Sequence, residues 1–108
     1  MSQETIDRAT KIQVRGYDQI TLFPMRWRLG YHRVGTMRGV PRRAFGHFGY
    51  GGSGAWADPA RKLSVAMTLN SGGGTPMGDL RMLRMNTVAL ACTRDRWRRS
   101  RANGHARL

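Results

Sequence analysis

Apolar and polar residues alternate along the middle of the chain, with the period of two that half-buried β-strands show. Between residues 25 and 34 the pattern places Met25, Trp27, Leu29 and Tyr31 on one face. Similar short stretches, bounded by glycine and proline, follow. The pattern predicts four strands, over residues 25–34, 44–50, 53–57 and 61–69.

The strand predicted over 61–69 has the clearest pattern. One face carries large apolar residues, and the other carries Ser64, Ala66 and Thr68. We expect a helix to lie on this second face, because its side chains are small. Before this strand, Asp58 and Pro59 fit the first two positions of a type I turn, with the aspartate accepting backbone N–H groups.

A helix is predicted to end at about residue 93. Its start is either Thr75, as the cap before Pro76, or Asp79. Its apolar residues fall on two nearly opposite faces, which is more than one sheet can cover. We expect a second partner on the uncovered face. The two faces are Leu80, Leu83, Leu90 and Ala91, and Met82, Met85, Val88, Ala89 and Cys92.

The expected fold class is α+β: an antiparallel β-meander with a C-terminal helix packed on one face. At 108 residues the chain has room for one domain at most. We divide it into an irregular N-terminal segment, or a short helix remnant, over 1–22, a partial domain over 23–93, and a basic tail over 94–108. The tail has no apolar period, which predicts disorder.

The net charge of +13 favours contact with polyanions, and seventeen of the nineteen cationic residues are arginine. Outside the tail the arginines are spread out, so we expect only weak, nonspecific binding of polyanions. Trp97 in the tail is available to stack on a base. Binding to a random duplex is expected to vanish at moderate salt.

The stretch from residue 45 to 70, FGHFGYGGSGAWADPARKLSVAMTLN, resembles the C-terminal signature of the serine β-lactamase-like superfamily. This superfamily includes class C β-lactamases, D,D-peptidases and related esterases. The resemblance lies in the order of His47-Phe48-Gly49, then GGSGAWADP, then LSVAMTLN. It implies that the chain is the C-terminal segment of such a domain.

Two other motifs of the superfamily are missing from this sequence. None of the five serines has lysine three residues on, and no tyrosine has asparagine two residues on. The lysine of Ser-x-x-Lys helps to deprotonate the nucleophilic serine. We therefore expect the chain alone to be inactive, and a missing N-terminal hydrolase lobe or a second copy is the expected partner.

The resemblance implies three site residues: His47, Gly49 and Tyr50. His47 takes the first place of the family's third motif, where histidine in place of lysine favours ester substrates over penicillin-type carboxylates. The backbone N–H of Tyr50, just after the motif glycine, would form part of the oxyanion hole, and a bulky side chain at Gly49 would be poorly tolerated. Alternatively, His47 is simply a partly buried strand histidine.

The sequence leaves three functions open: a fragment of an esterase- or lipase-type serine hydrolase, a small basic module that binds nucleic acid or another polyanion, and a non-functional remnant. His32 and His105 have no metal-ligand spacing to His47 or Cys92, so neither metal nor cofactor is expected. The first residues show neither the basic nor the apolar region of a signal peptide, and no apolar run is long enough to indicate a membrane span, so a cytoplasmic location is the default expectation.

Overall fold

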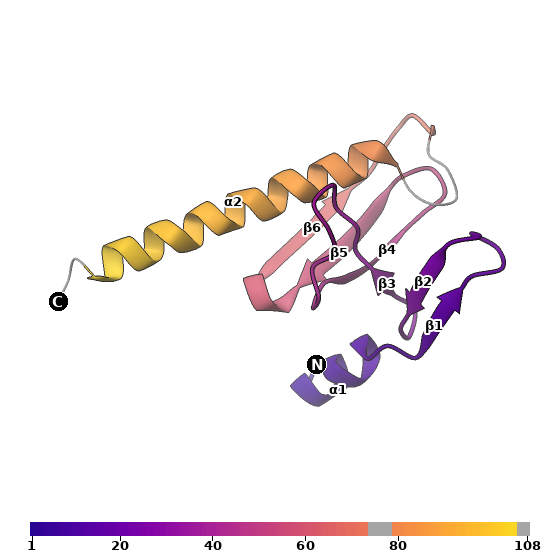
Figure 1. Ribbon diagram of the computed structural model, residues 1–108, viewed down its shortest axis with the longest axis horizontal. Helices are drawn as coiled ribbons and strands as arrows, with labels where there is room; N and C mark the ends of the chain where they lie inside the picture. The colour runs from indigo at the N-terminus through magenta and orange to yellow at the C-terminus, as the bar shows by residue number, and fades with distance from the viewer. Residues whose placement is uncertain (74–78, 106–108) are drawn as a thin grey trace.

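A computed structural model describes residues 1–73 and 79–105, with side chains as far as Arg94 (Figure 1). Two helices and six strands make up this part of the chain. In order they are α1 (Gln3–Thr10), β1 (Val14–Tyr17), β2 (Pro24–Trp27), β3 (His32–Arg33), β4 (Phe45–Phe48), β5 (Gly54–Asp58), the 3₁₀ turn η1 (Pro59–Arg61), β6 (Leu63–Met67) and α2 (Leu80–His105).

The main sheet is an antiparallel meander with strand order β3-β4-β5-β6. Helix α2 lies across one face of it, and the separate hairpin β1-β2 lies beside α1 at the opposite side of the molecule (Figure 1). This arrangement confirms the α+β fold class and the C-terminal helix predicted from the sequence. Strands β4, β5 and β6 fall inside three of the predicted ranges or within one residue of them.

The core lies between α2 and the face of the sheet that carries the large side chains. Trp56 of β5 and Met82 of α2 are buried together with Val34 and Ala44. Residues Leu63, Val65 and Met67 of β6 pack against this cluster. The prediction that the helix covers Ser64, Ala66 and Thr68 is therefore wrong: all three are exposed. Burial of apolar area on the large-residue face gives the greater stabilisation.

The turn before β6 forms as predicted. Asp58 is fully buried at the start of η1, and its carboxylate accepts the backbone N–H of Ala60 at 3.0 Å. The same carboxylate pairs with the guanidinium of Arg61. Lys62 ends the turn at φ 50°, in the left-handed region. These contacts fix where β6 begins, and so which of its residues face the helix.

The single strand predicted over 25–34 is wrong. Strand β2 ends at Trp27, and a tight turn follows in which the N–H of Arg28 donates to the carbonyl of Tyr31 at 2.7 Å, with Gly30 at φ 77°. β2 pairs with β1, whereas β3 belongs to the main sheet. After the turn the two faces are exchanged: Leu29, predicted on the apolar face, is 60% exposed, whereas His32, from the other face, is buried.

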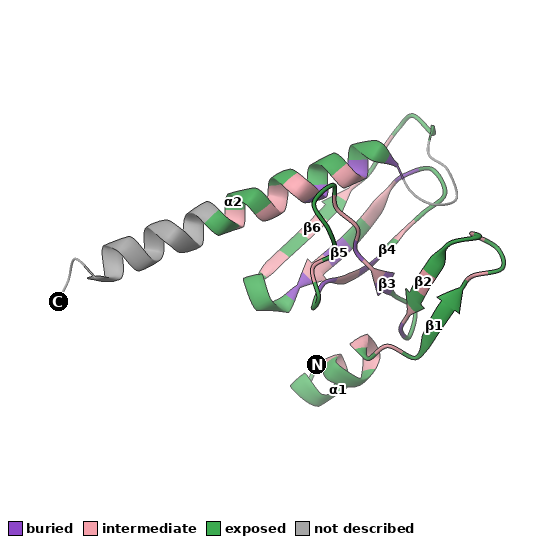
Figure 2. Ribbon diagram, viewed as in Figure 1, coloured by how far each residue is buried: buried purple, intermediate pink, exposed green. Residues whose placement is uncertain are grey.

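The N-terminal segment is more regular than predicted. Helix α1 corresponds to the short helix that was the alternative, with Ser2 accepting the N–H of Thr5 at its start. Strand β1 was not predicted at all, and it pairs with β2 over four residue pairs. Much of this region is exposed (Figure 2), so little apolar period marks it in the sequence.

Helix α2 begins after Asp79, whose carboxylate accepts the N–H of Arg81 at 2.7 Å. Thr75 and Pro76, the alternative start, lie outside the described residues. The helix continues to His105, so the prediction that it ends near Thr93, with an irregular tail beyond, is wrong for residues 94–105. Within the described part of the chain, no helix combines the length and the apolar character that crossing a membrane requires.

The faces predicted for this helix are also wrong. The side turned to the sheet combines members of both predicted sets with the fully buried Asn86. The outward side exposes Leu80 and Val88 to 64% and 60%, beside the exposed Met85, Ala91 and Cys92. As expected, apolar surface remains uncovered on the helix, although its members differ from those predicted.

Candidate functional site

His47 lies on β4, between β3 and β5, on the side of the strand away from α2. It pairs with Ala55 of the neighbouring strand β5, and both residues are exposed. Its neighbours Gly46 and Phe48 point towards the core instead, as the period of a strand requires. The histidine ring is therefore presented on the open face of the sheet, together with the small residues of β5 and β6.

A second histidine, His32, lies beside it, although no sequence pattern assigned it to the site. The ring centroids of His32 and His47 are 5.2 Å apart, and the indole of Trp27 lies 5.5 Å from His32 and 6.4 Å from His47. His32 is buried, and its Nε2 accepts the backbone N–H of Phe48 at 3.3 Å. With Nδ1 donating to the carbonyl of Arg33 at 2.8 Å, this is the neutral tautomer.

These contacts make His32 a clamp on the end of β4. The Nε2 of His32 accepts a hydrogen bond from the backbone N–H of Phe48, which lies between His47 and Gly49. This bond holds the backbone of the motif in place. Nothing in the sequence marks this role, because the hydrogen bond joins residues 16 positions apart and the alternation assigned His32 to the exposed face.

Acidification is expected to weaken the fold through His32. Burial lowers the pKa of His32 from 6.5, with the charges of His47 and Arg28 acting in the same direction against the hydrogen bond to Arg33. The unfolded chain therefore binds a proton at His32 more readily than the folded chain does. The contribution of His32 to the free energy of unfolding is fully present above about pH 6.5 and is lost as the pH falls towards the folded-state pKa. Thermal unfolding followed by circular dichroism between pH 7.5 and 5 should show a falling Tm. In His32→Asn this slope should disappear, and an unchanged slope would contradict the assignment.

Gly49 and Tyr50 lie in the turn between β4 and β5. The N–H of Gly49 donates to the carbonyl of Ser53 at 2.7 Å, and the N–H of Gly52 donates to that of Gly49 at 3.0 Å. Tyr50 is 74% exposed, and its N–H donates to no residue that the structure describes. An N–H without an acceptor, in a turn whose other backbone groups are hydrogen-bonded, is available to an external acceptor, as an oxyanion hole requires.

A Cβ added at Gly49 would meet only the carbonyl of Ser53, at 3.5 Å, which is ordinary contact. Packing within the described chain therefore does not require glycine at this position. Gly52 differs, because it has φ 92° and a Cβ there would collide with the carboxylate of Asp79. Gly52 is therefore packed closely against Asp79, whereas the space beside Gly49 is open.

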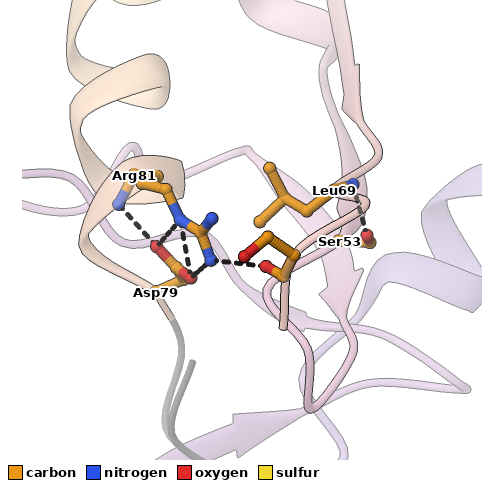
Figure 3. Close-up of polar contacts among 5 residues, drawn as sticks. Ser53, Leu69, Asp79 and Arg81 are labelled. Atoms are coloured by element: carbon orange, nitrogen blue, oxygen red, sulfur yellow. Dashed lines mark hydrogen bonds and ion pairs between the residues drawn. The ribbon is translucent and has the colours of Figure 1, made fainter. Parts of the chain in front are cut away.

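The turn lies close to the start of α2, where Gly52 is next to Asp79, and is hydrogen-bonded to the segment that follows β6 (Figure 3). Asp79 pairs with Arg81, whose hydrogen bonds are the largest influence lowering the pKa of the aspartate. The Arg81 guanidinium also donates to the carbonyl of Ser71 at 3.1 Å. From the turn itself, the hydroxyl of Ser53 accepts the N–H of Leu69 at 2.9 Å. Tyr50 therefore lies exposed on a turn that Ser53 joins to Leu69.

The serines with described hydrogen bonds do not have the surroundings of a nucleophile. Ser53 uses its hydroxyl to accept a backbone N–H, and Ser2 caps α1. Among the side chains that the structure describes, no serine hydroxyl bonds to a lysine, histidine or tyrosine. Over the same residues, no group of three His, Cys, Asp or Glu side chains is placed to hold a metal ion.

Comparisons with known proteins agree with this arrangement. The family model described as Beta-lactamase matches residues 1–89. A solved structure, that of a novel penicillin-binding protein (PBP) homolog from Caulobacter crescentus, is 32% identical with a TM-score of 0.70. The match covers 82% of this chain but only 25% of that one, so the chain spans a quarter of the homolog's length. No curated protein matches the sequence. On these grounds the chain belongs to the Beta-lactamase family.

Proposed function

We propose that the chain is the C-terminal part of a serine hydrolase of the esterase or lipase type, inactive in ester hydrolysis by itself. The observation that carries this proposal is the turn after β4, where the Tyr50 N–H has no acceptor among the described residues; His47, in the strand that leads to this turn, is exposed. These groups can orient a substrate and stabilise an oxyanion. They cannot replace a nucleophile, because that charge forms only after attack.

The open face of the sheet supports a missing lobe as the partner. His47, Ala55, Ser64 and Ala66 are all exposed on the face opposite α2. Apart from His47 their side chains are small, so a second body can approach the backbone of the sheet closely. The nucleophilic serine and its lysine would come from that body, next to the Tyr50 N–H. The order of motifs in the sequence supports this chain as the C-terminal part of the combined domain.

The test measures hydrolysis of p-nitrophenyl butyrate by the purified chain, alone and mixed with the part of the Caulobacter crescentus homolog that the chain does not match. Alone, the chain should turn over the ester no faster than its His47→Ala variant. The mixture should show saturable turnover. Saturable turnover by the chain alone, lost in one serine-to-alanine variant, would refute the proposal.

Two variants separate the backbone role from side-chain roles in the mixture. Gly49→Val should abolish the recovered activity by filling the space beside the Tyr50 N–H, and the isolated variant should still fold because a Cβ has room there. Tyr50→Phe is the matched control: it keeps the N–H and removes only an exposed hydroxyl, so activity should stay within about twofold. A large loss in Tyr50→Phe would point to the phenol instead.

A further inference from the structure

A basic cleft lies on the α2 side of the molecule, away from the turn that carries Tyr50. The loop of residues 36–42 reaches α2 (Figure 1), where the N–H of Met37 donates to the hydroxyl of Thr87 at 3.0 Å. Between the loop, η1 and the helix is a cavity of about 240 Å³. Its lining includes four arginines from these three segments: Arg38, Arg42, Arg61 and Arg94. We call it the arginine cleft.

The charge of the arginine cleft is poorly balanced. Among the residues whose side chains the structure describes, no acidic residue lines it, and Arg61 pairs with the fully buried Asp58. Arg38, Arg42 and Arg94 are exposed, and their side chains make no ion pair with a residue that the structure describes. Within the part of the chain whose side chains are described, three arginines thus line a small concave space without an acidic partner, which concentrates positive potential there.

The walls of the cleft are held in place by the protein itself. The hydroxyl of Thr36 donates to the carbonyl of Gly39 at 2.6 Å and accepts the N–H of Arg38 at 3.1 Å. Thr87 donates to the carbonyl of Leu83 at 2.7 Å while accepting from Met37. The loop that carries Arg38 and Arg42 is thus anchored to α2 before any ligand arrives, which reduces the entropy lost on binding.

A second cleft adjoins the first and shares Arg42 with it. This cavity, of about 260 Å³, is also lined by Arg28 and Arg43, with Asp7 as its acidic residue. The Arg28 side chain is only 9% exposed and donates from Nε to the carbonyl of Thr10 at 2.6 Å. Its Nη1 is buried without a hydrogen-bond partner in the described part of the chain. A buried guanidinium with an unused donor favours an anion nearby.

We propose that the arginine cleft and the adjoining cleft together bind an oligophosphate, a linear chain of phosphate groups. Planar guanidinium forks match phosphate oxygens in pairs, and arginine stays charged at neutral pH. Because Arg42 lines both cavities, an extended chain of phosphates can contact both, whereas a single phosphate fills only one. The cations line concave cavities, which suits a narrow chain better than a convex nucleic-acid duplex.

The test uses isothermal titration calorimetry of the full chain with inorganic tripolyphosphate at 0.15 M NaCl. Arg38→Gln and Arg94→Gln should each weaken binding by about tenfold, equivalent to roughly 1.4 kcal/mol. Arg84→Gln is the matched control, since it removes the same charge from the exposed, outward side of the same helix. Its affinity should stay within about twofold of the wild type. Thermal unfolding checks that all three variants fold, as expected for exposed side chains.

Further arms identify the source of the phosphates. Equal affinity for tripolyphosphate and ATP would assign recognition to the phosphate chain alone, and tighter binding of ATP would assign a nucleoside triphosphate; both support the site. Equal weakening by Arg84→Gln and Arg94→Gln would overturn it, because the affinity would then follow net charge. No binding of tripolyphosphate at millimolar concentration, or tighter binding of a random duplex with equal losses in all variants, would also overturn it.

Discussion

Gly46→Ala is expected to abolish cooperative folding of this chain. Gly46 is buried on β4 opposite Trp56, and a Cβ there would lie closer than 3.0 Å to the carbonyl of Ala55 and to the Cα and Cβ of Trp56. Because two of these atoms belong to the backbone of β5, no side-chain rotation relieves the collision. The two central strands would have to separate, and overpacking typically costs about 1–3 kcal/mol even where side chains can adjust.

The loss should be decisive because the core of this chain is small. Among the residues whose side chains the structure describes, only four hydrophobic ones are buried, and Trp56 is the largest of them. Native domains are stable by about 5–15 kcal/mol, and a small core places a chain towards the lower end of that range. Circular dichroism during thermal unfolding should show no sigmoidal transition for Gly46→Ala. Gly51→Ala is the matched control in the same hairpin, since no heavy atom lies within 4 Å of its added Cβ. A Tm for Gly46→Ala within a few degrees of the wild type would contradict the argument.

The parts of the fold that the sequence predicted correctly depend on neighbouring residues. Strand β6 alternates cleanly, and Asp58 and Pro59 form the turn before it through contacts within three residues. The β4-β5 hairpin is bounded by glycines that allow its turn. In such segments local preference and the final fold agree, so a reading of pattern and turn chemistry is sufficient.

The errors occur where distant contacts override the local pattern. The alternation runs unbroken through residues 28–31, yet Gly30 turns the chain there and sends β2 to a different sheet. Both faces of α2 are apolar, so the period alone could not say which one meets the sheet. The small face of β6 looked suitable for a helix, but the larger residues opposite bury more apolar area. The sequence pattern alone does not tell how much apolar area each of these alternative packings would bury.

The candidate site divides in the same way. The resemblance to the family supplied His47, Gly49 and Tyr50, and the structure places all three at the end of β4 and in the turn that follows; their catalytic role stays a prediction. His32, which supports this strand end, was missed because it acts through a residue 16 positions away. The two basic clefts were missed as well, since their arginines are scattered in sequence and meet only in the folded chain.

The most consequential polar residue of the core is Asn86, which no sequence pattern singled out. It is fully buried on α2, where its Oδ1 accepts the indole N–H of Trp56 at 2.6 Å and its Nδ2 donates to the carbonyl of Gly35 at 3.0 Å. One amide thus joins the helix, the centre of the sheet and the start of the loop that leads to the arginine cleft. These contacts span 30 and 51 residues of sequence.

Asn86→Leu is expected to destabilise the chain strongly. Leucine has a similar size but leaves the Trp56 N–H and the Gly35 carbonyl buried without partners, and each such group costs about 1–3 kcal/mol. Thermal or urea unfolding should show a large fall in stability, while Asn70→Leu, at an exposed position, should change it little. Trp56→Phe supplies the second half of a double-mutant cycle. Because the two residues share a hydrogen bond, the combined loss should be smaller than the sum of the single losses. Strict additivity would show that the amide contributes to the core by size alone.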